Sequence, residues 1–168
     1  MRLYRFSPIQ NEVQMMKAVE YIHGACHVLC KQSMSRYLPI AGNVGIFCHD
    51  NNEYEFLTKM REELTDASDS EYGKYFRLYT PITIPAITDI PKTSYTYLYI
   101  RKPDSRKPHV GDIDFYLEPK QYTELKQSLL DGKVIKGARI LDRPDLDMIE
   151  LHDPDIDALG YIGNKIFY

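Results

Sequence analysis

Two segments near the middle of the chain, residues 95–101 and 112–117, alternate in a way that is typical of strands with one buried face. On the first segment, one face carries Tyr95, Tyr97, Tyr99 and Arg101. On the second segment, the face turned away from the expected core carries Asp112, Asp114 and Tyr116. We expect the two segments to pair as an antiparallel hairpin, which would bring these side chains together on one side of a sheet.

The remaining sequence predicts helices before and after this hairpin. Apolar residues at spacings of three and four predict a long helix over residues 9–33, and capping signals predict helices over about 50–64 and 119–131. Further strands are expected near residues 2–6, 44–48, 75–84, 138–141 and 147–151, with a short acidic helix after Pro154. This order indicates an α+β fold: a mostly antiparallel mixed sheet with about three helices packed largely on one face. The length of 168 residues fits a single domain, 1–168.

Composition excludes several classes of protein. The net charge of −3 argues against a polycation built for nucleic acid. Mean hydropathy is −0.41, and no apolar run approaches the roughly 20 residues of a membrane span, so no membrane partner is expected. The three cysteines do not form a disulfide framework, which favours a reducing, cytoplasmic location.

The tyrosine-bearing strand face lies beside a basic loop, residues 101–109, with four bases and one acid. Aromatic and cationic side chains together suit a protein interface or can stack nucleic-acid bases, but helices covering this face would instead bury the tyrosines. Our first hypothesis is a small binding module whose partner is another protein, because the net charge disfavours nucleic acid. Its expected binding residues are Tyr95, Tyr97, Tyr99, Arg101, Arg106, Lys107 and Tyr116.

Asp112 and Asp114 are two residues apart, so their carboxylates are expected roughly 7 Å apart on one strand face. Such a pair can hold Mg²⁺, and Gly111–Phe115 resembles the Asp-x-Asp strand of nucleotidyltransferases. That resemblance implies magnesium-dependent phosphoryl or nucleotidyl transfer centred on the two aspartates, although the preceding Gly-Ser motif of that family is absent. The alternative is an ion pair with Arg101 across the hairpin.

The first helix carries a second candidate metal site. Imidazole and thiol groups, the ligands that zinc prefers, recur at helical spacing in His23, Cys26, His27 and Cys30. Cys48 and His49 end a nearby strand and could complete a metal shell, and Cys30 or Cys48 could act as a nucleophile with His27 or His49. The same positions also fit a buried helix face, because free cysteine packs as a small hydrophobic residue.

An acidic segment follows near the C-terminus. Residues 149–155, Ile-Glu-Leu-His-Asp-Pro-Asp, resemble the closing strand of glyoxalase-like proteins, whose glutamate is a metal ligand. The resemblance implies that role for Glu150. The long first helix departs from the paired βαββ repeats of that family, so we do not assign the chain to it.

Overall fold

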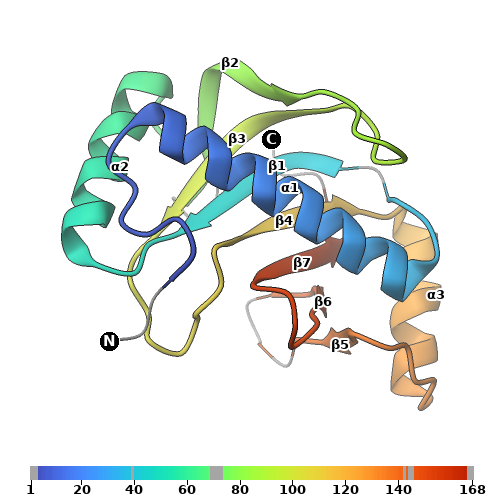
Figure 1. The fold of residues 1–168 in the computed structure, drawn as a ribbon. Helices are drawn as coiled ribbons and strands as arrows, with labels where there is room; N and C mark the ends of the chain where they lie inside the picture. The colour runs from blue at the N-terminus through green and yellow to red at the C-terminus, as the bar shows by residue number, and fades with distance from the viewer. Residues whose placement is uncertain (1–3, 39, 69–73, 142, 144–145, 166–168) are drawn as a thin grey trace.

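One mixed sheet organises the molecule in the computed structural model, which describes residues 4–38, 40–68, 74–141, 143 and 146–165. The helices are α1 (Glu12–Met34), α2 (Asn51–Leu64) and α3 (Pro119–Leu130). The strands are β1 (Ile40–Phe47), β2 (Phe76–Ile84), β3 (Thr93–Arg101), β4 (Gly111–Tyr116), β5 (Ala138–Ile140), β6 (Ile149–Leu151) and β7 (Ala158–Gly163). These strands lie in the order β2-β3-β1-β4-β7-β6-β5 (Figure 1).

The α+β class predicted from the sequence is confirmed. The β1–β3 and β4–β7 pairs are parallel, and the other four pairs are antiparallel, so the sheet is mixed. No helix among the described residues has the length and apolar character that crossing a bilayer would require.

The predicted hairpin between the two alternating segments is wrong. Strand β1 lies between β3 and β4, with Phe47 opposite Arg101 and Gly45 opposite Asp112. The physical reason is burial: the described side chains of β1 are buried on both faces, which is typical of a strand in the interior of a covered sheet. Arg101 consequently forms its ion pair with Asp104, at 3.6 Å, instead of with Asp112.

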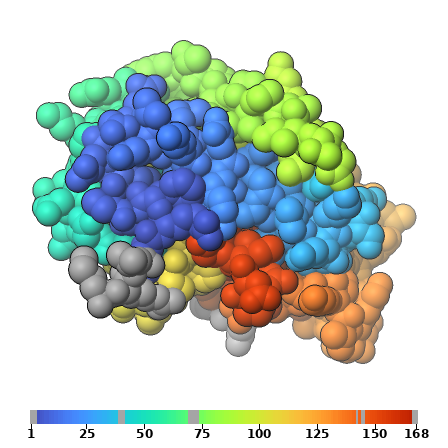
Figure 2. Space-filling model, in the orientation of Figure 1, coloured from blue at the N-terminus to red at the C-terminus, as the bar shows by residue number. Residues whose placement is uncertain are grey.

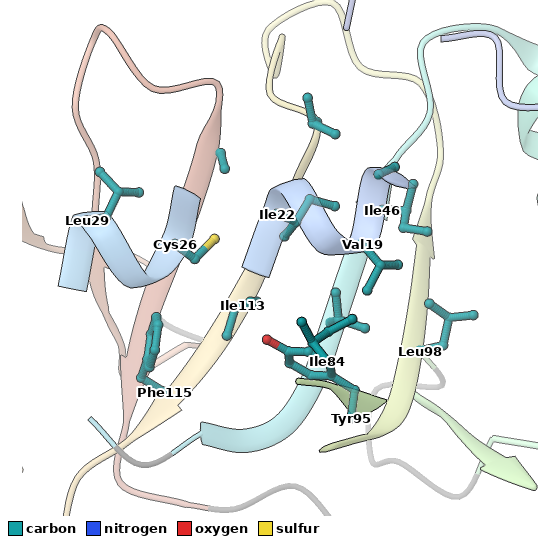
Figure 3. Packing of buried hydrophobic residues seen from close by; sticks show 14 of the residues in the cluster. Val19, Ile22, Cys26, Leu29, Ile46, Ile84, Tyr95, Leu98, Ile113 and Phe115 are labelled. Carbon is teal, nitrogen blue, oxygen red and sulfur yellow. The ribbon is translucent and has the colours of Figure 1, made fainter. Parts of the chain in front are cut away.

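Helix α1 covers one face of the sheet along the middle of the molecule (Figures 1 and 2). The N-cap residue of α1 is Asn11, whose side-chain Oδ1 accepts a hydrogen bond from Gln14 N at 2.9 Å. The apolar stripe of the helix packs onto alternate residues of the central strands (Figure 3). The main core cluster includes Val19, Ile22, Cys26, Leu29, Ile46, Leu98, Ile113 and Phe115.

The two ends of the chain differ most from expectation. Residues 4–6, the described part of the first expected strand, are not in a strand. The acidic helix expected after Pro154 is a turn, and it is followed by β7, which sequence reasoning missed. Two of the six residues of β7 are glycines, which are depleted in strands, so the segment carried no clear strand signal.

Candidate functional site

The face of the sheet turned away from α1 holds a cavity of about 420 Å³. Alternate residues of β3 and β4 reach it, because successive side chains of a strand point to opposite faces. Segments flanking β2 and β6 complete its wall. The lining residues are Lys74, Tyr75, Tyr99, Arg101, Asp104, Arg106, Lys107, Asp112, Asp114, Leu141, Arg143, Leu146, Met148, Glu150 and Tyr161.

The carboxylate of Asp112 sits over a glycine on the neighbouring strand. A Cβ atom at Gly45 would lie 2.0 Å from Asp112 Oδ1 and 3.3 Å from Tyr99 Cδ1. No side chain fits at position 45 without displacing the aspartate. Gly45 therefore provides the space in which Asp112 and Tyr99 flank the same point of the sheet.

Asp114 is the more firmly held member of the pair. Its Oδ2 accepts from Tyr75 Oη at 2.9 Å and from Asn43 Nδ2 at 3.3 Å. Burial raises the pKa of Asp114 to about 6, although the two hydrogen bonds favour its ionised form and oppose the rise.

Asp112 is only partly exposed, and its pKa is raised well above the ordinary value of an aspartate. Burial is the main cause, and the negative charge of Asp114 adds to it. The positive charges of Arg101 and Lys107 act in the opposite direction. Both shifts favour a pair that keeps a proton at a pH above the ordinary range of an aspartate.

Glu150 forms a separate, charge-compensated cluster on the opposite wall. Its carboxylate accepts hydrogen bonds from Arg139 and, at 3.2 Å, from Tyr161 Oη, and lies 3.6 Å from Lys107 Nζ. Burial alone would raise the pKa of Glu150, but Arg139 and Lys107 hold it below its usual range. Glu150 is therefore a stably ionised carboxylate of the cavity.

The basic loop, residues 101–109, places Arg101, Arg106 and Lys107 at the rim of the cavity. The side chain of Arg106 is 87% exposed and lies 3.1 Å from Asp104, which also pairs with Arg101. The Arg101 guanidinium lies 4.8 Å from the centre of the Phe47 ring. These contacts orient Arg101 without burying its charge completely.

The structure brings together only part of the predicted binding set. Tyr99, Arg101, Arg106 and Lys107 line the cavity with both aspartates, so the shared face predicted for Asp112 and Asp114 is confirmed. Among the other predicted tyrosines, Tyr97 is buried outside the cavity lining, and Tyr116 lines a separate hollow beside Tyr37 and Glu118.

The predicted place of Tyr95 on this face is wrong. It packs in the core beneath α1 (Figure 3). Its Oη lies 2.8 Å from His23 Nδ1. The pairing of β2 with β3 is irregular at this point, because the partners of Tyr97 and Tyr95 are Arg77 and Ile82, so the regular sheet geometry that the prediction assumed is interrupted there.

The proposed zinc ligands of α1 are buried and have other contacts. His27 Nδ1 lies 2.8 Å from the His23 carbonyl oxygen, and Cys26 Sγ donates to the Leu159 carbonyl at 3.0 Å. Cys30 Sγ lies 3.5 Å from the Arg36 carbonyl. Among the described residues, no group of three or more histidine, cysteine or acidic side chains is arranged to hold a metal ion. We therefore do not carry this helix face forward as a site.

Sequence reasoning missed Tyr75 and Tyr161 and named Glu150 only through a resemblance. Tyr75 precedes β2, where local sequence does not show that its hydroxyl reaches β4. Tyr161 belongs to the strand that was not predicted. The pairing of Tyr161 with Asp114 and Glu150 emerges only from the sheet register.

Comparisons with known proteins give a fold likeness. No family model matches the chain, and no curated protein matches it. A solved structure described as "Structural Genomics, Protein EC4020" is 16% identical, with a TM-score of 0.59 over 98% of this chain and 94% of that chain. A methylmalonyl-CoA epimerase from Streptomyces coelicolor, also 16% identical, gives a TM-score of 0.32 over 76% of this chain and 99% of that chain. The first likeness shows a shared fold, and the second is too low to carry an argument.

Proposed function

We propose that the chain is an enzyme that binds a small organic anion in this cavity and moves a proton on it through Asp112 and Asp114. The observation that carries the proposal is the pair of adjacent carboxylates facing a cavity whose rim is cationic. A concave site of a few hundred Å³ suits a small molecule, whereas protein partners are bound on broader surfaces. We therefore favour a small ligand over the protein partner expected from the sequence.

The two aspartates are suited to different roles. Asp114 accepts two hydrogen bonds and takes the ionised, proton-accepting role, whereas Asp112 retains the proton of the pair. A pair of carboxyl groups with different environments supplies an acid and a base at the same pH. Both aspartates line the cavity, so a bound molecule can meet the proton donor Asp112 and the proton acceptor Asp114 at the same time.

The other lining residues indicate the class of substrate. Arg101 and Lys107 can hold a carboxylate, and the Tyr99 hydroxyl group can donate to a neighbouring oxygen. Leu141 and Met148 provide an apolar wall for a short carbon chain. A carbonyl acid, whose C–H bond next to the carbonyl group becomes acidic when that oxygen is hydrogen-bonded, fits this arrangement.

Proton exchange in D₂O tests the proposal directly. The protein is incubated with 2-oxobutyrate or acetoacetate, and loss of the C–H signal next to the carbonyl group is followed by proton NMR. We expect exchange above the protein-free rate for at least one carbonyl acid. Asp112→Asn keeps the shape of the side chain and should reduce this exchange by about 100-fold or more, the typical contribution of a general acid or base.

Asp155→Asn is the matched control, because Asp155 is exposed and does not line the cavity. This variant should keep the wild-type rate. Exchange that survives in Asp112→Asn, or the absence of both exchange and binding across a panel of 2-oxo and 3-oxo acids, would contradict the proposal.

A Mg²⁺ site at the same pair is a second candidate, supported by Asn43. This residue is buried, and its Oδ1 has no hydrogen-bond partner among the described residues, while its Nδ2 donates to Asp114. An amide oxygen beside two carboxylates is a ligand set that Mg²⁺ accepts.

Calorimetric titration with MgCl₂ separates the two candidates. A magnesium site predicts a binding heat that Asp114→Asn removes and that exposed Glu124→Gln retains. A wild-type protein that gives no heat up to millimolar Mg²⁺ would leave proton transfer as the function of the pair.

A further inference from the structure

A second hollow, of about 730 Å³, lies beside the main cavity on the side of α2. The two hollows share Lys74, Tyr99, Arg101, Asp104 and Arg106 along their common border. The residues that line only the second hollow are Tyr54 and Arg61 of α2, Phe76 of β2, and Ile100, Lys102 and Pro103. The two hollows are therefore neighbours, and a molecule in the main cavity lies against side chains that also line the second one.

The charge of the second hollow is strongly one-sided. Among the described residues, five cations and one acid, Asp104, line it. Asp104 is already engaged by Arg101 and Arg106, so it does not compensate Arg61 or Lys102. Lys102 is exposed, and its Nζ lies 5.9 Å from the centre of the Tyr54 ring. The hollow consequently favours a ligand that carries more than one negative charge.

Arg61 of α2 lines this hollow with a weakly compensated charge. Its side chain is only 11% exposed, and its guanidinium carbon lies 3.6 Å from the centre of the Phe76 ring. Its Nε has no hydrogen-bond partner among the described residues, and its ion pair with Glu62 is 4.0 Å long, with a Glu62 side chain that is 67% exposed. A largely buried guanidinium with so long an ion pair would be stabilised by a bound anion.

We propose that this second hollow binds the phosphate end of a phosphorylated small molecule whose reactive end lies in the main cavity. The second half of this statement rests on the function proposed above; the phosphate site itself does not. Arginine stacked on an aromatic ring presents its remaining N–H groups in the fork geometry that phosphate oxygens accept. A single carboxylate supplies one negative charge, whereas Arg61 and Lys102 each add a positive charge to this hollow.

Calorimetric titration with inorganic pyrophosphate at low ionic strength tests the site. We expect wild-type protein to bind pyrophosphate more tightly than it binds succinate, with an affinity that falls as salt is added. Arg61→Gln should weaken binding by about tenfold, as expected for a charged hydrogen-bonding partner. Because Arg61 also packs on Phe76, exposed Lys102→Gln provides a second variant that does not threaten folding, and it should weaken binding several-fold.

Two controls make the outcome specific. Lys59→Gln removes the same charge from an exposed position of the same helix and should bind pyrophosphate like wild type. Asp112→Asn should also retain pyrophosphate binding, even if it abolishes proton exchange, so failure of the proposed function and failure of this site are distinguishable.

The phosphate site is overturned if wild-type protein does not bind pyrophosphate at millimolar concentration, or if Lys59→Gln weakens binding as much as Lys102→Gln. A single-stranded oligonucleotide that binds at least ten times more tightly than pyrophosphate, through the same two residues, would overturn the small-molecule assignment in favour of nucleic acid.

Discussion

At the scale of single residues, the site depends on the absence of a side chain at position 45. Gly45→Ala would place a methyl group 2.0 Å from Asp112 Oδ1. We expect a loss of about 1–3 kcal/mol in the free energy of unfolding, measured by urea denaturation, because a packed site must shift to accommodate the methyl group. Gly163→Ala is the matched control, since the nearest atom to its added Cβ is 3.6 Å away. Equal effects of the two substitutions would contradict this role of Gly45.

The aspartate pair also predicts how stability depends on pH. The pKa of Asp114 rises from 3.8 to about 6 on folding, and that of Asp112 rises well above 3.8. Such groups hold more protons in the folded state, so their stabilising contribution is complete below the unfolded pKa and is lost as pH rises through the folded pKa.

Asp112→Asn removes the charge that the folded state disfavours. The variant should gain stability relative to wild type between pH 5 and pH 8, reaching about 1–3 kcal/mol at pH 8. Urea unfolding of both proteins at the two pH values measures this difference. A stability difference that is the same at pH 5 and pH 8 would show that Asp112 titrates normally.

At the scale of elements, one glutamate joins the start of α2 to the chain that leads into α1. The carboxylate of Glu53 accepts from Ile9 N at 3.0 Å, Ser7 Oγ at 2.8 Å and His49 N at 2.8 Å. Half of the capping box predicted from Asp50 and Glu53 is confirmed: the Asp50 side chain accepts a hydrogen bond from Glu53 N. The Glu53 carboxylate accepts from the backbone N–H of His49 instead of that of Asp50.

Replacement of Glu53 tests this connection between the start of α2 and the segment before α1. Glu53→Ala should lower the free energy of unfolding by about 2–4 kcal/mol, because it leaves buried donors without an acceptor. Glu53→Gln should lose less, since one acceptor oxygen remains. Glu55→Ala, at an exposed position of the same helix, should change stability by less than about 0.5 kcal/mol. A loss at Glu55 similar to that at Glu53 would point to a general helix effect.

At the scale of the whole molecule, the strand order predicts which elements resist local unfolding the most. β1 and β4 lie in the interior of the sheet beneath α1, whereas β5 is a three-residue strand at its edge. Hydrogen exchange followed by mass spectrometry should therefore show the slowest exchange in β1, β4 and α1 and faster exchange in β5 and α3. Faster exchange in β1 than in β5 would contradict the observed order.

Local pattern predicted the elements well and their neighbours poorly. The stripe of α1, the Asp50 cap and the proline at the start of α3 are local signals, and each produced the expected helix. Strand pairing is non-local, so the alternation in 95–101 and 112–117 could not show that β1 lies between these segments.

Only part of the candidate site could be predicted, again because strand pairing is not visible in local sequence. The shared face of Asp112 and Asp114 follows from strand alternation alone. Two other features depend on how strands pair across the sheet and have no local signature in the sequence. They are the irregular β2–β3 pairing beside Tyr95 and the hydrogen bond from Tyr75 to Asp114.

The central claim is that Asp112 and Asp114 together keep a proton near neutral pH at the floor of the cavity. Carbon-13 NMR of their carboxyl groups, followed from pH 3 to pH 9, measures this directly. We expect two coupled steps, one near the value of about 6 found for Asp114 and one well above the ordinary range of aspartate. Two independent titrations near pH 4 would contradict the account.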